Sequence, residues 1–256
     1  MGKLNTAITA FLNKFGGKAP KPRVTSAVIV AGGSSTRMGE GLSKQWLTVG
    51  GLPVIVRTLL AFDRAKTVTD IVLVVKADEI DRYRHIAEQY GLKKPLRIVT
   101  GGDTRQQSAK KGFLACADKA DFVAIHDGAR CLVTPEEIDR VCNAAYLAGA
   151  AIAATRVHDT VKLAAENGYI EKTVDRDKVW LAQTPQVFKT ALYHAATAVA
   201  EKDGISVTDD SSLAEHIEHP VRLVECSPEN LKLTTPEDMI RAEAILAARE
   251  NKEANA

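Results

Sequence analysis

Short apolar runs alternate with amphipathic segments along most of this 256-residue chain, and that alternation restricts the folds open to it. The apolar runs occupy residues 27–31, 71–75, 96–99, 122–125, 151–154 and 221–224. Helical patterns fill the intervals at about 53–63, 78–90, 104–117, 135–148, 189–202 and 236–249. Continuous apolar strands separated by amphipathic helices are typical of a sheet that is buried on both faces. The sequence therefore predicts an α/β fold with a doubly wound, mostly parallel sheet.

Residues 156–180 interrupt this alternation. Two extended runs, 160–163 and 169–174, flank Asn167-Gly168, a pair that favours a tight hairpin turn. The pattern predicts a β-hairpin arm that projects from the sheet. Such an arm needs a surface to pack on, and we expect a second subunit to provide it.

The composition suits one soluble domain, because 45% of the residues are hydrophobic and 26% are charged. We expect a basic extension at 1–23, disordered or forming a short helix, a main domain at 24–250 that includes the arm at 156–180, and a tail at 251–256. The extension carries five basic residues and no acid, which leaves 29 basic against 32 acidic residues in the rest. This balance, with only 5% aromatic residues, argues against a nucleic-acid-binding protein.

The four cysteines have neither C-x-x-C spacing nor histidines at metal-ligand spacing. They are expected to be reduced thiols in a cytoplasmic protein. No apolar run approaches the length of about 18 residues that a membrane span needs, so we expect no membrane association.

A loop of small residues follows the first predicted strand. Gly32 and Gly33 begin it, Arg37 lies within it, and Lys44 ends it. Backbone N–H groups of such a loop can approach anionic oxygens, and the two cations favour a polyphosphate ligand. The loop lacks the G-K-[ST] of a Walker motif. It also lacks the third glycine and the downstream acid of a dinucleotide fold, which argues against a nicotinamide-dependent oxidoreductase.

Two further polar loops follow predicted strands, at 101–105 and 126–130. Ligands of doubly wound sheets bind outside the carboxyl ends of the strands, so these loops are expected to converge with the first. Each motif also has a purely structural interpretation. The Gly101-Gly102-Asp103 segment fits a turn with an N-capping acid, and His126 with Asp127 fits a buried pair. Asp127 equally suits a substrate hydroxyl or Mg²⁺.

Eight motifs in register resemble one enzyme family: A-G-G-x-x-x-R-M-G…K-Q, G-G-x-x-R-x-x-S, H-D-G-A-R, D-T-V-K, T-V-D-R, Q-T-P-Q-x-F, T-D-D and N-x-K-x-T-x-P-E-D. Together, over residues 25–249, they are similar to the 2-C-methyl-D-erythritol 4-phosphate cytidylyltransferases of the non-mevalonate isoprenoid pathway. The resemblance implies transfer of CMP from CTP to methylerythritol phosphate, with release of pyrophosphate. It also implies a divalent cation such as Mg²⁺, and a homodimer whose arm reaches the neighbouring active site.

The resemblance also implies a role for each matching residue. The expected catalytic residues are Arg37, Lys44, Arg176 and Lys232. The expected CTP-binding residues are Ala31, Gly32, Gly33, Gly102, Asp103 and Ser108. The expected substrate-binding residues are Asp127, Arg130, Thr160 and Thr184, of which Thr160 and Arg176 would serve the partner. No protein metal ligand is certain, since the CTP phosphates would hold most of the Mg²⁺, with Asp127 as a candidate.

Cys131 departs from the family pattern, which usually has proline at that position. The nearest alternative function is a cytidylyltransferase for ribitol 5-phosphate or another polyol phosphate, although Thr173-Val174-Asp175-Arg176 fits the methylerythritol branch better. A non-catalytic nucleotide-binding module is the alternative from another class. The presence of every expected charged residue argues against it.

Overall fold

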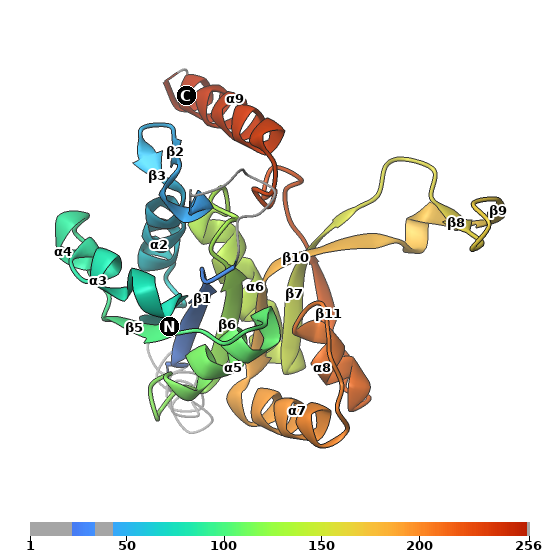
Figure 1. Ribbon diagram of the computed structural model, residues 1–256, viewed down its shortest axis with the longest axis horizontal. Helices are drawn as coiled ribbons and strands as arrows, with labels where there is room; N and C mark the ends of the chain where they lie inside the picture. Colours follow the sequence, from blue (N-terminus) through green and yellow to red (C-terminus); the bar gives the residue numbers. More distant parts are fainter. Residues whose placement is uncertain (1–21, 34–42, 255–256) are drawn as a thin grey trace, which may run out of the picture.

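The computed structural model describes residues 22–33 and 43–254 and centres on one seven-stranded sheet (Figure 1). Most of the expected basic extension and Arg37 therefore lie outside the described residues. In spatial order the strands are β11 (Arg222–Glu225), β7 (Ala150–Arg156), β10 (Trp180–Lys189), β6 (Phe122–Asp127), β1 (Thr25–Val30), β4 (Asp70–Val75) and β5 (Leu96–Thr100). The predicted α/β fold with a mostly parallel sheet is confirmed.

Strand β10 was not predicted from the sequence, and it makes the sheet mixed. It pairs antiparallel with both β6 and β7, whereas the other neighbours in the sheet run parallel. Its centre holds Gln183, Thr184 and Pro185, and the register with β7 shifts between Ala182 and Gln186. Polar residues and a proline in mid-strand conceal the periodicity by which a buried strand is recognised.

Helices cover both faces of the sheet. They are α2 (Val54–Arg64), α3 (Ile80–Tyr83), α4 (Ile86–Gln89), α5 (Arg105–Leu114), α6 (Pro135–Ala148), α7 (Thr190–Lys202), α8 (Ser211–His216) and α9 (Pro236–Ala254). The helix expected at 78–90 is instead a 3-10 turn, η3 (Ala77–Glu79), followed by α3 and α4. No signal at the sequence level pointed to α8. None of the described helices combines the length and apolar character required to cross a bilayer.

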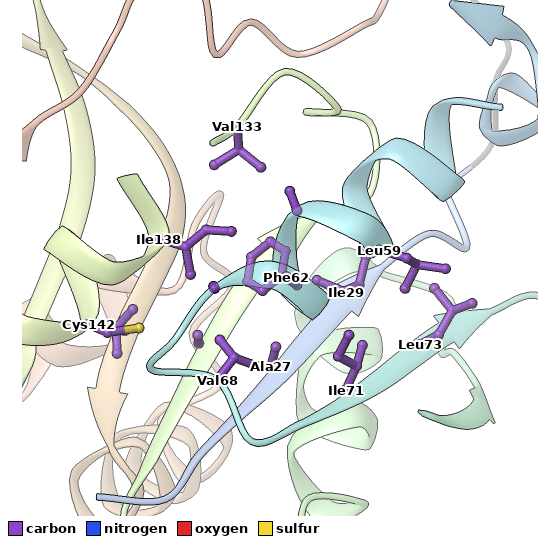
Figure 2. Close-up of a cluster of buried hydrophobic side chains, with 14 of the residues drawn as sticks. Ala27, Ile29, Leu59, Phe62, Val68, Ile71, Leu73, Val133, Ile138 and Cys142 are labelled. Atoms are coloured by element: carbon purple, nitrogen blue, oxygen red, sulfur yellow. The ribbon is translucent and has the colours of Figure 1, made fainter. Parts of the chain in front are cut away.

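Alternate residues of each central strand enter different cores, which is the period-2 pattern of a sheet buried on both sides. Ala27 and Ile29 of β1 pack with α2 and α6, while Val28 packs with α5 and α7 on the other face. Figure 2 shows the first of these clusters, in which Phe62 of α2 lies among side chains from several elements.

Helix α6 begins as its sequence predicts. The Thr134 side chain accepts a hydrogen bond from the Glu137 N–H, and the Glu137 side chain accepts one from the Thr134 N–H, which completes a capping box. At the start of α9, the carboxylate of Asp238 instead accepts from the N–H groups of Thr234 and Thr235. The acid thus caps that helix, rather than Thr235 as its position suggested.

The predicted hairpin arm is present. Strands β8 (Lys162–Ala164) and β9 (Ile170–Thr173) pair antiparallel, and Gly168 adopts a left-handed φ of 82° in the turn between them. The arm extends from β7 and β10 away from the helices and the sheet (Figure 1). Tyr169 and Ile170 near its tip are 75% and 65% exposed, so the arm carries apolar surface that its own chain leaves uncovered.

Candidate active site

The loops at the carboxyl ends of neighbouring strands are joined by backbone hydrogen bonds. The Ala31 N–H donates to the Val74 carbonyl oxygen, the Gly101 N–H to that of Val75, and the Gly128 N–H to that of Val30, over 2.7–2.9 Å. These contacts bring the loops after β1, β5 and β6 to one edge of the sheet, as the α/β fold predicts. Between them lies a cavity of about 460 Å³, the donor cavity below.

Most of the residues expected to bind CTP line the donor cavity. They are Gly32, Gly33, Lys44, Gly102, Asp103 and Ser108, joined there by Asp127 and Lys232. Ala31 is buried at the end of β1 and does not line it. Arg37 lies outside the described residues, so its expected position beside Lys44 stays a prediction.

The loop before α5 is held close to that helix. The Gly102 N–H donates to the Ser108 hydroxyl oxygen at 3.0 Å, and the hydroxyl is oriented to donate to the Gly102 carbonyl oxygen at 3.3 Å. A Cβ on Gly102 would lie only 2.5 Å from the Gln107 Cβ, so this tight return needs glycine. Ser108 is 4% exposed and supports the loop first of all; its contact with a base stays a prediction.

The structural interpretation of Asp103 as the N-cap of α5 is wrong. Thr104 caps the helix by accepting from the Gln107 N–H, and the Gln107 side chain completes the box. The carboxylate of Asp103 is exposed at the donor cavity and has no hydrogen bond or ion pair within the described residues. It can therefore accept hydrogen bonds from a ligand.

Lys44 begins a short 3-10 turn, η2 (Lys44–Trp46), that is anchored to the body of the protein. The Trp46 ring packs on that of Tyr83, with 4.7 Å between the centroids, and Gln45 is buried. Packing of its neighbours fixes the backbone of Lys44, and its side chain lines the donor cavity.

A second cavity of about 240 Å³, the acceptor cavity below, adjoins the first. Arg130, Thr184, Gln183 and Asp209 line it. Both cavities share three residues: Arg105, Asp127 and Lys232. These three charged side chains therefore form the wall between two neighbouring ligand-sized spaces.

Asp127, at the end of β6, lies at the centre of this wall. Its Oδ1 accepts from Arg105 Nε at 2.9 Å, and its Oδ2 pairs with Lys232 Nζ at 2.9 Å. Arg130 Nε lies 3.8 Å from Oδ2. Burial alone would raise the pKa of Asp127, but Arg105 and Lys232 outweigh it and hold that pKa below its usual range. Asp127 is thus an anion at neutral pH and a poor general base.

Thr184 and His126 support Asp127 from behind. The Asp127 N–H donates to Thr184 Oγ1 at 3.1 Å, and the same hydroxyl lies 2.9 Å from His126 Nδ1. The other ring nitrogen of His126 lies 3.2 Å from the Arg130 carbonyl oxygen. Burial lowers the pKa of His126 to about 3, so the ring is neutral at physiological pH. This agrees with the structural interpretation of His126. It also gives the Thr184 hydroxyl two partners inside the protein, while its expected substrate contact stays a prediction.

Lys232 reaches the wall from a segment far along the chain. The Leu233 N–H donates to the Ala129 carbonyl oxygen at 2.9 Å, and Arg130 donates to the Asn230 carbonyl oxygen at 2.8 Å. These bonds fasten residues 230–233 to the loop after β6. The interpretation of Lys232 as an ordinary exposed strand residue is wrong, because its side chain is paired with Asp127.

Thr160 and Arg176 line neither cavity of their own chain. Arg176 lies in the arm, where its guanidinium donates to the His158 carbonyl oxygen at 2.8 Å rather than pairing with Asp175. Cys131 also lies away from both cavities. It is buried in the small core below α9, and burial raises the pKa of its thiol to about 11.

The expected role of Asp127 as a metal ligand does not fit its contacts, because cations occupy both of its oxygens. Across residues 22–33 and 43–254, no three His, Cys, Asp or Glu side chains cluster as a metal site would require.

Sequence reasoning gave no role to several cavity residues. Arg105 was quoted within a motif but assigned no function, and Lys76 and Gln45 were not singled out. The signal for Arg105 was an arginine directly after a Gly-Gly turn at a strand end. Nothing comparable marks Lys76, which follows β4 and lines the donor cavity.

Comparison with known proteins agrees with this site. The sequence model of the family described as "IspD: 2-C-methyl-D-erythritol 4-phosphate cytidylyltransferase" matches residues 25–248. A 2-C-methyl-D-erythritol 4-phosphate cytidylyltransferase from Geobacillus kaustophilus is 44% identical over 224 residues, which cover 87% of this chain and 97% of the relative. One from Pelotomaculum thermopropionicum is 40% identical over 232 residues, covering 90% and 98%.

A solved structure gives the same result. The 4-diphosphocytidyl-2C-methyl-D-erythritol synthase from Anaerococcus prevotii is 34% identical, with a TM-score of 0.79. The match covers 88% of this chain and 97% of that protein. The similarity therefore extends over the sheet, both cavities and the arm together.

Proposed function

This chain belongs to the 2-C-methyl-D-erythritol 4-phosphate cytidylyltransferase family, and we infer that it transfers CMP from CTP to 2-C-methyl-D-erythritol 4-phosphate, releasing pyrophosphate. The reaction serves isoprenoid-precursor synthesis. The structural observation that carries this inference is the pair of adjoining cavities with a shared charged wall. A transferase that joins two phosphorylated substrates needs two neighbouring sites with cations at their junction.

We propose that CTP occupies the donor cavity. Its cytosine would lie against the Gly101–Ser108 loop, where the Asp103 carboxylate can accept from the exocyclic amine. Its triphosphate would lie along Gly32, Gly33 and Lys44, with Arg37 completing the set. The two cations would neutralise charge that grows on the α-phosphate and on the departing pyrophosphate.

The acceptor phosphate would lie in the acceptor cavity. One of its oxygens attacks the α-phosphorus of CTP, a new P–O–P linkage forms, and the bond to pyrophosphate breaks. The attacking oxygen is already an anion, so no general base is required. The repulsion between two anions must be cancelled, and Lys232 and Arg130 are the cations at that point. Positioning and electrostatics are sufficient for the chemistry.

A divalent cation, Mg²⁺ by preference, belongs to the proposal as charge neutralisation for the triphosphate, bound mainly by phosphate oxygens. We also propose a cytoplasmic location. All four cysteines are free thiols, as a reducing compartment favours.

We expect pyrophosphate release to require both CTP and methylerythritol phosphate. The measurement is a coupled pyrophosphate assay with the purified full chain, with ribitol 5-phosphate as the rival acceptor and ATP and UTP as control nucleotides. Release that is as fast with ribitol 5-phosphate would favour the alternative substrate. A chain that binds CTP and releases no pyrophosphate with either acceptor would instead be the non-catalytic module.

We further propose a homodimer in which the arm supplies Arg176 and Thr160 to the partner's acceptor cavity. The apolar tip of the arm and the distance of the arm from its own cavities support this arrangement.

Mixed dimers test this directly. Arg176→Ala and Lys44→Ala homodimers should each be nearly inactive, whereas co-expressed chains should regain about a quarter of the wild-type activity, since half of the dimers then hold one intact site. Co-expressed Lys44→Ala and Lys232→Ala chains are the matched control. Both changes affect the same body, so this pair should show less rescue. Equal activities of the two mixtures would contradict an arm that acts on the partner.

A further inference from the structure

Asp210 lies behind the charged wall and touches neither cavity. It precedes α8, and its side chain is 1% exposed. Its Oδ1 accepts from the Tyr193 hydroxyl at 2.7 Å, and its Oδ2 accepts from Arg105 NH1 at 2.7 Å. A carboxylate buried to this extent cannot contact substrate. Any role in the reaction must pass through the groups that it holds.

Arg105 carries the connection forward. Its guanidinium joins Asp210 on one side to Asp127 on the other, and Asp127 in turn pairs with Lys232. A continuous series of contacts of 2.7–2.9 Å therefore runs from Tyr193 in the core to Lys232 at the cavities. Lysine could not replace Arg105, because only a planar guanidinium donates in two directions at fixed angles.

The two carboxylates together determine how Arg105 is oriented. Its remaining nitrogen, NH2, is buried and has no partner within the described residues. Burial alone would lower the pKa of Arg105, but Asp210 and Asp127 outweigh it and raise that pKa. At the other end, burial and the charge of Asp210 raise the pKa of Tyr193, so its hydroxyl stays a donor. Without Asp210, one end of a buried cation would lose its counter-ion.

The neighbouring Asp209 does different work. Its carboxylate accepts from the side chains of Ser211, Ser212 and Gln186, which fixes the start of α8 against β10. Asp209 thus places the backbone of Asp210, and Asp210 makes the contact with Arg105.

We propose that Asp210 is a positioning residue for cytidylyl transfer: through Arg105 it orients Asp127, and Asp127 holds Lys232 where the acceptor phosphate arrives. The inference rests on the function proposed above and adds a determinant of catalytic rate that lies outside both ligand sites.

Asp210→Asn keeps the size of the side chain and removes its charge. Positioning predicts that kcat falls by about 10- to 100-fold, as is typical when a group that orients a functional residue is lost. The KM for CTP should change little. A purely electrostatic role predicts the opposite, because removal of a negative charge beside an anion site should lower KM and leave kcat unchanged. A purely structural role predicts a lower Tm with unchanged kcat per folded molecule.

Arg105→Lys supplies the second arm of the test. If Asp210 acts through Arg105, Asp210→Asn should cost far less in the Arg105→Lys background than in the wild type. Tyr193→Phe keeps the ring and should lower kcat in the same direction, by a smaller factor. Asp203→Asn is the matched control: it removes a carboxylate that pairs with His216 on the surface, and it should leave kcat unchanged.

The experiment measures pyrophosphate release with CTP and methylerythritol phosphate, together with thermal unfolding of every variant. An active wild type with unchanged kcat in Asp210→Asn would overturn the inference, as would full additivity with Arg105→Lys. A wild type that is inactive with this acceptor would instead overturn the proposed function.

Discussion

Replacement of Lys44 by alanine is expected to lower kcat by about 100- to 1000-fold, the usual cost of losing a charge contact to a transition state. Lys44 lines the donor cavity beside Gly32 and Gly33, where the triphosphate would lie. Negative charge grows there as pyrophosphate leaves, so the loss should appear in kcat more than in the KM for CTP. Steady-state kinetics of pyrophosphate release, with each substrate varied in turn, measure both constants.

Lys93→Ala is the matched control for this variant. Lys93 is an exposed lysine before β5, at the opposite edge of the sheet from the cavities, and its replacement should leave kcat unchanged. Thermal unfolding should show a similar Tm for both variants. Turnover of Lys44→Ala close to that of the wild type would refute the role of Lys44. The same fall in kcat is expected for Arg37→Ala on sequence grounds alone.

Lys232→Ala should lower kcat/KM for methylerythritol phosphate by about 100- to 1000-fold, because the acceptor phosphate loses the cation at its point of attack. Asp127 keeps Arg105 as a partner, so the fold should survive. The KM for CTP should change much less, since the triphosphate would lie on the Lys44 side of the wall. Measurement of kcat/KM for each substrate separates the two effects.

Lys232→Arg is the informative companion variant. It keeps the positive charge beside Asp127 and should retain part of the activity that Lys232→Ala loses. A Lys232→Ala enzyme with equal losses toward both substrates would place this lysine outside the acceptor site. Such a result would move the boundary between the two cavities, and the donor cavity would still be the CTP site.

Much of the fold could be predicted from local patterns. The apolar runs of β1, β4 and β6 are buried on both faces, and such strands announce themselves by continuous hydrophobicity. The capping box of α6 and the turn at Asn167-Gly168 depend on neighbouring residues alone. β10 escaped prediction because Gln183, Thr184 and Pro185 interrupt its apolar pattern, and only its pairing with β6 and β7 makes it a strand.

The candidate site divides in the same way. Gly102, Asp103 and Lys44 could be proposed from strand-end loops, because parallel strands bring their carboxyl ends to one edge. Lys232 was found only through a family resemblance, since its own segment reads as an ordinary exposed strand. Asp210 was quoted in a motif without a role, because its contacts with Tyr193 and Arg105 join residues that are distant in sequence.

The sequence alone is enough to determine a doubly wound α/β protein with an arm, a polyphosphate loop and the family to which the chain belongs. These properties follow from periodicity, turn chemistry and motifs, all of which act over short stretches of chain. The tertiary structure decided that Arg105, Asp127 and Lys232 form one wall between two cavities, and that Asp210 supports it. Buried charges become partners only when folding removes them from water together, and no local pattern records which ones will meet.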